Sequence, residues 1–169
     1  KLILDKNINA IAIASPPVSH KSIIKFAIKH NKHIFCEKPF TCSLKEANDI
    51  CKLIKGRKIS HMVNYEFPEI DAFRFFKKRI LNKKIKIKKI NLSWLLNIKS
   101  KGNRWKEYHN KGGGMMFNYV CHTIFYMEFL FGKIISIKSN IYKNKKNISS
   151  LNSVICFKSG LLAKLNTKV

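Results

Sequence analysis

Short apolar runs alternate with helically spaced segments along the first third of the chain. Ala10–Ala14 and His33–Cys36 are largely apolar and lack regular polar positions, which is typical of strands buried on both faces of a parallel sheet. Ile59–Tyr65 is expected to form a third strand. The first 66 residues therefore predict three strands of one sheet.

Two helices are expected between these strands. Ser19 is placed to cap the first, which runs to about His30 with an apolar side made of Ile23, Ile24, Ala27 and Ile28. Ser43 begins the second, where Glu46 completes a capping box and Gly56 ends the helix. Its apolar positions keep helical spacing, namely Leu44, Ala47, Ile50, Cys51 and Ile54. The alternation of strand and helix predicts right-handed parallel crossovers.

The pattern changes after residue 66. Pro68 is expected to open a helix to Leu81, with Phe73, Phe76 and Ile80 on its inner side. Ile85–Leu92 alternates as a half-exposed strand does. Further segments are expected to form an apolar helix and antiparallel strands, namely helix Met115–Phe131 and strands Ile134–Tyr142, Ser153–Phe157 and Leu161–Thr167.

The predicted fold class is α/β, in two parts. Residues 1–66 would form a partial Rossmann parallel sheet, and residues 67–169 an α+β domain with an open antiparallel sheet. No internal repeat is visible in the sequence.

The positive charge of the chain raises the question of nucleic-acid binding. The formal net charge is +25 at pH 7, but the cations are mostly lysines spread along the chain, and the readers of bases and phosphates favour arginine. The lysines accompany many Ile, Asn and Phe residues, all with A/T-rich codons, so base composition explains the charge without a nucleic-acid partner. A basic surface would still attract a phosphorylated or carboxylated substrate.

The cysteines and the remaining composition favour a cytoplasmic protein. Five cysteines without a C-x-x-C pair give no disulfide framework and no zinc site, so no metal is expected. No apolar stretch approaches the roughly 20 residues of a membrane span, and we expect no membrane partner. The first residues match neither an initiator Met nor a signal peptide, so we expect a piece of a longer protein.

Two polar segments follow predicted strands where ligands bind to open α/β sheets. Glu37-Lys38-Pro39 stands where the second strand ends, and the alternative interpretation is a surface turn with an ion pair. Ser15-Pro16-Pro17 and His20 follow the first strand; there the hydroxyl and the imidazole can reach a ligand, or the segment is a capped turn with a solvent-facing histidine.

A third candidate segment lies in the second part. Gly112-Gly113-Gly114 precedes a helix in which Asn118 and His122, four residues apart, share one face. The glycines permit a backbone path closed to other residues and let a ligand approach. The alternatives are a flexible loop and a histidine satisfied within the core.

Taken together, these segments resemble the Gfo/Idh/MocA family, the glucose–fructose oxidoreductase and inositol dehydrogenase group. The resemblance covers nearly the whole chain, namely Ala10–His20, Lys32–Ala47, Val63–Pro68, Trp94 and Gly112–Gly132. It implies an NAD- or NADP-dependent oxidoreductase that acts on a sugar, a sugar nucleotide or a polyol. It also implies a Rossmann domain followed by an α+β domain whose open sheet serves in homo-oligomer contacts.

The resemblance also implies roles for single residues. Lys38 matches the catalytic lysine and His122 the catalytic histidine, and Ser15, Pro16, His20 and Glu37 fall where the family lines the nicotinamide half of the cofactor. His122 would take the proton of a secondary alcohol and Lys38 would donate a hydrogen bond to the same oxygen, so both should converge on one cleft. We expect Pro39 to be a cis residue that directs Lys38. Further candidates for substrate contact are Tyr65, Arg104, Trp105 and Tyr119.

This chain departs from the family pattern at two points. Asn118 stands where most members have Asp; a carboxylate stabilises an imidazolium, whereas an amide only orients it. We therefore expect a lower kinetic pKa than in Asp-bearing relatives, and an upward shift on Asn118→Asp. Asn at this place resembles branches that act on nucleotide sugars. Second, no G-x-G-x-x-G is present, so we expect poor dinucleotide binding by this chain alone and an exposed edge at the first strand.

Two alternatives to an oxidoreductase remain open. One is a non-catalytic remnant of the same fold, and the other is a basic nucleic-acid-binding module. Binding to DNA that ignores sequence and vanishes at modest salt would indicate charge alone.

Overall fold

The computed structural model describes residues 1–82, 85–97, 105–144 and 147–169. They form two compact units, of which the first contains residues 1–65 and described residues of 104–113, and the second contains described residues of 66–103 together with 114–169. Each unit has its own apolar core. Among the described residues, no helix is long and apolar enough to cross a membrane.

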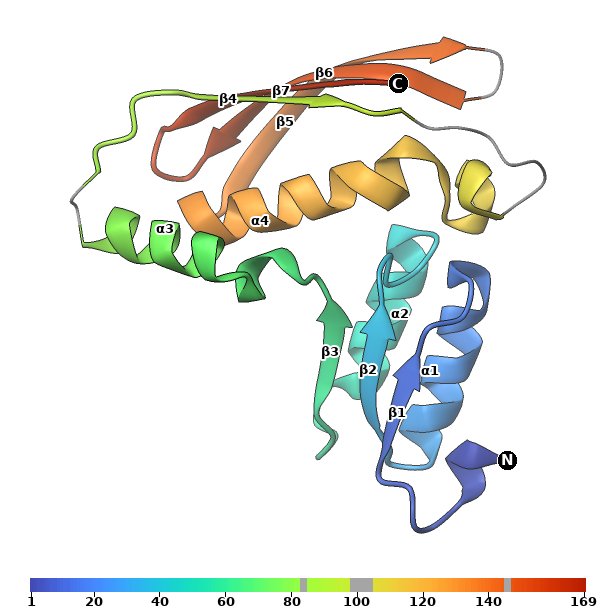
Figure 1. Ribbon diagram of the computed structural model, residues 1–169. Helices are drawn as coiled ribbons and strands as arrows, with labels where there is room; N and C mark the ends of the chain where they lie inside the picture. Colours follow the sequence, from blue (N-terminus) through green and yellow to red (C-terminus); the bar gives the residue numbers. More distant parts are fainter. Residues whose placement is uncertain (83–84, 98–104, 145–146) are drawn as a thin grey trace. The chain divides into compact units, whose positions relative to one another are not determined.

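The first unit is a parallel sheet covered by two helices (Figure 1). Strands β1 (Ala10–Ile13), β2 (His33–Glu37) and β3 (His61–Asn64) pair in parallel in the order β1-β2-β3. The helices α1 (His20–Lys29) and α2 (Leu44–Ile54) contribute Ile24, Ile28, Ile50 and Ile54 to the same core as the strands. The parallel strand–helix succession is therefore confirmed.

The strands of this sheet are buried on one face only, which corrects the expectation of burial on both. Ile13, Ile34 and Cys36 are buried, whereas Phe35 is 40% exposed and Met62 is 51% exposed. The physical reason is that both helices cover the same face, since the isoleucines of α1 and α2 share one core cluster. Successive side chains of a strand point to opposite faces, so the other side chains stay uncovered.

Details of the two helices differ from the expectations. The Ser19 hydroxyl donates to the Pro16 carbonyl oxygen at 2.8 Å within a 3₁₀ turn, Pro17–Ser19, and does not cap α1. Ser43 does cap α2, accepting from the Glu46 N–H at 3.3 Å. Leu44 is 77% exposed and Cys51 is exposed, so neither belongs to the inner side of α2.

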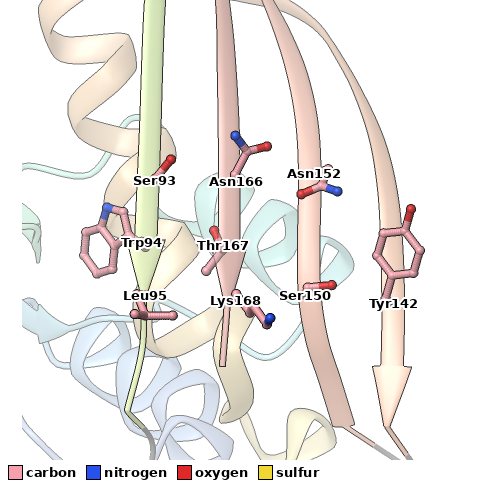
Figure 2. Close-up of a pocket in the computed structure, with 9 residues that line it drawn as sticks. All are labelled: Ser93, Trp94, Leu95, Tyr142, Ser150, Asn152, Asn166, Thr167 and Lys168. Carbon is pink, nitrogen blue, oxygen red and sulfur yellow. The ribbon is translucent and has the colours of Figure 1, made fainter.

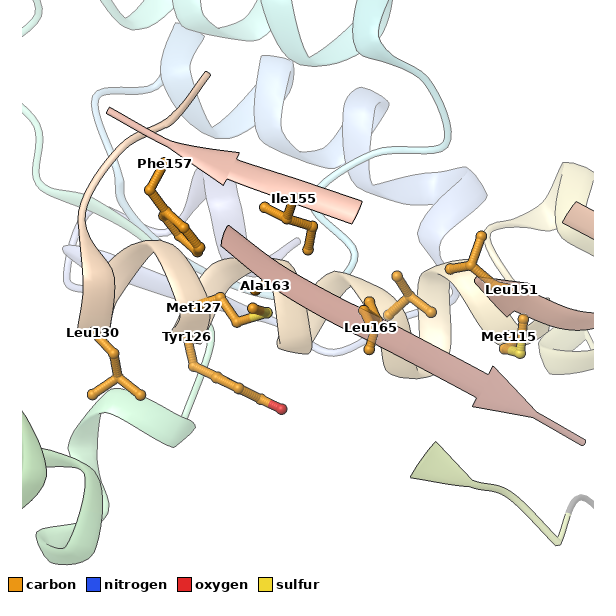
Figure 3. Packing of buried hydrophobic residues seen from close by; sticks show 10 residues of the cluster. Met115, Tyr126, Met127, Leu130, Leu151, Ile155, Phe157, Ala163 and Leu165 are labelled. Carbon is orange, nitrogen blue, oxygen red and sulfur yellow. The ribbon is translucent and has the colours of Figure 1, made fainter. Parts of the chain in front are cut away.

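In the second unit one helix lies along a face of a four-stranded sheet, and another helix packs against the first (Figure 1). Its strands have the order β4-β7-β6-β5 and are β4 (Ile90–Leu95), β5 (Ile134–Asn144), β6 (Asn147–Phe157) and β7 (Leu162–Lys168). Its longer helices are α3 (Asp71–Leu81) and α4 (Cys121–Phe131). Figure 3 shows Met127 and Leu130 of α4 beside Ile155, Phe157 and Leu165 of the sheet.

Three expectations for this unit are corrected. The sheet is mixed and not purely antiparallel, because β4 pairs with β7 in parallel. The first strand begins at Ile90 and not at Ile85, since the alternation of single residues cannot locate a pairing partner. Of the expected inner side of α3, Phe73 and Ile80 pack against the core, but Phe76 is 36% exposed and no residue of this helix, all of which is described, is fully buried.

The apolar helix before β5 contains a π-helical segment. Met116–Val120 is π-helical, and the Cys121 N–H bonds to the Met116 carbonyl oxygen, five residues back. The regular α4 begins only at Cys121. Such π-bulges occur frequently at functional sites, and this one carries two of the predicted site residues, Asn118 and Tyr119.

Candidate functional site

The carboxyl ends of the parallel strands carry most of the site residues predicted in the first unit. Ser15 and Pro16 follow β1, Glu37 ends β2 and Lys38 comes directly after it. Because parallel strands present their carboxyl ends at one edge of the sheet, these residues are brought together along that edge. The Lys38–Pro39 peptide bond is cis, as expected.

His20 joins the turns that follow β1 and β2. Its ring is fully buried, with Nε2 at 2.8 Å from the Ser15 carbonyl oxygen and Nδ1 at 3.0 Å from the Pro39 carbonyl oxygen. The alternative of a solvent-facing histidine is therefore wrong. Both ring nitrogens face protein carbonyls, so His20 contributes to this edge by holding the two turns in place. Its direct contact with a cofactor stays a prediction.

Asn64 is a residue of this edge that the sequence interpretation missed. Its side-chain amide donates to Glu37 Oε1 at 2.7 Å, and the two residues are register partners at the ends of β3 and β2. The signal that could have found it is its place as the last polar residue of the third strand. The hydrogen bond fixes the carboxylate next to Lys38.

The thiol of Cys36, beneath this edge, is protonated and unreactive. Cys36 is buried, and burial, together with the nearby Glu37 carboxylate, raises its pKa to about 12. Its Sγ lies 3.4 Å from His20 Nδ1 and 3.3 Å from the Glu37 carbonyl oxygen. Because reaction requires the thiolate, Cys36 is a packing residue and not a nucleophile.

Gly112 and Gly113 lie so close to other parts of the first unit that a side chain would not fit at either position. Gly112 has φ +80°, and a Cβ there would lie 2.5 Å from Pro17 Cβ; a Cβ at Gly113 would lie 2.4 Å from the Trp105 carbonyl oxygen. These two glycines permit close approach of the chain to the turn after β1 and to its own preceding segment. The structure thus gives a reason for two of the three glycines that needs no ligand.

His122 forms the centre of the predicted site in the second unit. It lies near the start of α4, is only 6% exposed, and its ring makes an edge contact with Phe67 at 5.2 Å between centroids. Phe67 in turn contacts Phe73 and Tyr126. This aromatic wall holds the imidazole in a mostly apolar environment.

A carboxylate approaches His122 from outside its own helix. Glu66 Oε2 lies 3.8 Å from His122 Nδ1, and the Glu66 side chain is half exposed. The sequence interpretation missed Glu66, which is 56 positions away in the chain and carries no motif of its own. This distance is longer than a hydrogen bond, and the contact is an ion pair only when the imidazole is protonated.

The remaining predicted residues are distributed over both units. Tyr65 follows β3 and is half-buried, and Trp105 begins a 3₁₀ turn, Trp105–Glu107, of the first unit. Tyr119, in the π-helical segment, makes an edge contact with Trp94 of β4 at 6.2 Å between centroids. Arg104 lies outside the described residues.

Two hollows, one in each unit, are lined by other residues. One of about 510 Å³ lies on the second sheet, where Tyr142, Asn152, Asn166 and Lys168 surround it (Figure 2). Another of about 530 Å³ lies in the first unit between β2, β3 and α2. The candidate site is supported by the chemistry at the strand ends and at His122.

Comparison with known proteins decides the family. Residues 1–65 match the sequence model of an oxidoreductase family described as the NAD-binding Rossmann fold, and residues 77–167 match that of its C-terminal alpha/beta domain. The chain belongs to the Gfo/Idh/MocA family of oxidoreductases. Within this family, the carboxyl edge that carries Lys38 lies in the NAD-binding domain, and His122 lies in the C-terminal domain.

Two curated relatives show how far the sequence similarity extends. An uncharacterized oxidoreductase of Synechocystis is 30% identical over 146 residues, which are 83% of this chain and 39% of the relative. The 2,7-anhydro-N-acetylneuraminate hydratase of Escherichia coli is 24% identical over 142 residues, 79% of this chain and 36% of the enzyme. The chain thus spans well under half the length of these two relatives.

Solved structures share the fold. Levoglucosan dehydrogenase in complex with NADH and levoglucosan superposes with a TM-score of 0.90 at 21% identity, over 99% of this chain and 49% of that chain. A putative myo-inositol dehydrogenase from Sinorhizobium meliloti gives a TM-score of 0.85 at 19% identity, over 99% of this chain and 52% of that chain. At such identities the likeness shows the fold alone.

Proposed function

We propose that this chain supplies the catalytic lysine and histidine of an NAD- or NADP-dependent dehydrogenase. Its substrate is a secondary alcohol of a sugar, a sugar nucleotide or a polyol. The observation that carries the proposal is the position of Lys38, which follows a parallel strand at the carboxyl edge of a domain matched to an NAD-binding Rossmann fold.

The residues present fit one end of the dinucleotide. Ser15, Pro16, Glu37 and Lys38 lie along the carboxyl edge, where open α/β sheets hold their ligands, and the Asn64 amide fixes the Glu37 carboxylate there. They would hold the nicotinamide end. The sequence contains no G-x-G-x-x-G for the pyrophosphate, so we expect the 169-residue chain alone to bind dinucleotide poorly.

The chemistry of the proposed site follows from two side chains, Lys38 and His122. A bound nicotinamide would supply the acceptor for the hydride of the carbinol carbon. His122, as a neutral imidazole, accepts the proton of the hydroxyl, which becomes a carbonyl oxygen. The Lys38 ammonium donates a hydrogen bond to that oxygen while its negative charge develops. Tyr65, Arg104, Trp105 and Tyr119 are proposed substrate contacts.

The proposal includes a cellular compartment and an oligomeric state. All five cysteines are free, which suits the reducing cytoplasm. We also propose that the intact protein is a homo-oligomer that uses its open sheet. A stretch of exposed side chains on β5, including Ile137 at 43% and Ile141 at 49% exposure, offers apolar area for such a contact.

The test measures reduction of NAD and NADP at 340 nm with panels of sugars, sugar nucleotides and polyols, using the gene product that contains this chain. Lys38→Gln and His122→Gln should each lower kcat by about 10²- to 10⁴-fold. The exposed Lys45 and His61 provide matched controls, and Lys45→Gln and His61→Gln should leave the rate unchanged.

Each alternative has its own outcome in these experiments. Full activity in the Lys38→Gln or His122→Gln variant would reject the assigned roles. A folded protein without activity on any panel would favour the non-catalytic remnant. Binding to DNA that discriminates between sequences at physiological salt would favour the nucleic-acid module.

A further inference from the structure

The position of Glu66 bears on the proton transfer assigned to His122. Asn118, four residues before His122, carries an amide, and an amide cannot stabilise an imidazolium by charge. Glu66, 56 positions earlier in the chain, brings a carboxylate oxygen to 3.8 Å from His122 Nδ1. The second unit therefore has a negative charge at the histidine in spite of Asn118.

Neighbouring charges are taken up by other partners. Glu69, in the same turn as Glu66, pairs with Arg74, and Lys77 of α3 donates to the Phe129 carbonyl oxygen near the far end of α4. The titratable side chains within four residues of His122 along the chain are those of Tyr119, Cys121 and Tyr126. The Glu66 carboxylate lies within ion-pair distance of the imidazole.

We propose that Glu66 is the positioning carboxylate of His122. This rests on the proposed function, in which His122 is the general base. The negative charge 3.8 Å from Nδ1 acts without a hydrogen bond. It favours the tautomer with its proton on Nδ1, which leaves the lone pair of Nε2 to accept the substrate proton. The same carboxylate stabilises the imidazolium that results.

The burial of His122 and the exposure of Glu66 fit their roles as base and positioning carboxylate. His122 is nearly enclosed by Phe67 and its own helix, whereas Glu66 is 52% exposed. An exposed carboxylate remains ionised at low cost, and its field acts on a group that water screens poorly. The expected effect is moderate, because solvent screens the carboxylate itself.

The first experiment follows the titration of His122 by NMR in the 169-residue chain, without substrate or cofactor. Glu66→Gln should lower the midpoint of the His122 Cε1–H titration by about half a unit to one unit. Glu69→Gln removes the same charge three residues away and should leave the midpoint unchanged. Equal shifts in both variants, or none in Glu66→Gln, would overturn the proposal.

A second measurement needs no substitution and so does not depend on how a variant folds. The Glu66 carboxyl carbon should show a chemical-shift step at the pH at which His122 titrates, and its absence would count against the pairing. A rescue completes the test: Asn118→Asp in the Glu66→Gln background should return the His122 midpoint towards the original value.

Activity separates this inference from the proposed function. If His122 is the base, the acidic limb of the pH–kcat profile should move to lower pH in Glu66→Gln, because the base stays neutral to lower pH. If His122→Gln keeps full activity, the proposed function fails, yet the NMR shift can still show the pairing. If the midpoint does not move while His122→Gln is inactive, the Glu66 inference alone fails.

Discussion

His20 and Pro39 are joined by a contact of 3.0 Å between the imidazole Nδ1 and the carbonyl oxygen, beneath the edge that presents Lys38. With the contact to Ser15 on its other nitrogen, the ring ties together the turns after two neighbouring strands. The lysine side chain thus leaves a backbone that is held on both sides, by His20 at one turn and by the Glu37–Asn64 hydrogen bond at the strand ends.

Replacing His20 should destabilise the first unit. His20→Gln removes the bridge and leaves buried carbonyl oxygens of Ser15 and Pro39 with poorer partners, at a cost of about 2–3 kcal/mol in the free energy of unfolding. Urea unfolding of the chain measures it. His61→Gln, at an exposed site of β3, is the control and should change stability by less than about 0.5 kcal/mol. Similar losses in both variants would contradict the bridging role.

Gly112 and Gly160 have similar backbone conformations but different surroundings. Both have positive φ, at +80° and +82°, but a Cβ at Gly112 would strike Pro17, whereas one at Gly160 would meet nothing within 4 Å. Gly160→Ala should cost about 1 kcal/mol from backbone strain. Gly112→Ala should cost about 1–3 kcal/mol more, from overpacking. Equal costs in thermal or urea unfolding would show that the contact with Pro17 is unimportant.

The cysteines should differ in their reaction with iodoacetamide. A pKa raised to about 12 leaves Cys36 almost wholly protonated at pH 8, because protonation persists until the pH approaches the pKa. We expect its alkylation to be at least about 100-fold slower than that of the exposed Cys51, and to become comparable in urea. Mass spectrometry of peptides gives both rates. Early labelling of Cys36 in the folded chain would contradict its burial.

The hydroxyl of Thr167 offers a stabilising substitution. Its Oγ1 is buried and, within the described residues, has no hydrogen-bond partner. Thr167→Val keeps the shape and removes the unsatisfied group, so the free energy of unfolding should rise by about 0.5–1 kcal/mol. Ser153→Ala is the contrast, since the Ser153 hydroxyl contacts the Ser139 hydroxyl at 2.8 Å, and it should lower stability. If Thr167→Val lowers the stability, the Thr167 hydroxyl has a hydrogen-bond partner in the folded protein.

Local sequence determined the order of the elements and the chemistry at the strand ends. Helical spacing placed Ile24 and Ile28 in the core, and Ser43 with Glu46 marked the start of α2. These features depend on neighbours within one or two turns, so the chain records them directly. The Glu37-Lys38-Pro39 triplet was found for the same reason: a strand end followed by charged residues is visible without knowing what packs against it.

Only the tertiary structure decided which faces are covered and which distant residues meet. Phe35 is exposed because α1 and α2 share one side of the sheet, and β4 pairs with β7 in parallel although some seventy residues separate them. Asn64 reaches Glu37, and Glu66 reaches His122, across 27 and 56 positions. Such pairings follow from register and helix packing, which no periodicity encodes, and they set the environments of the two residues to which the proposed chemistry is assigned.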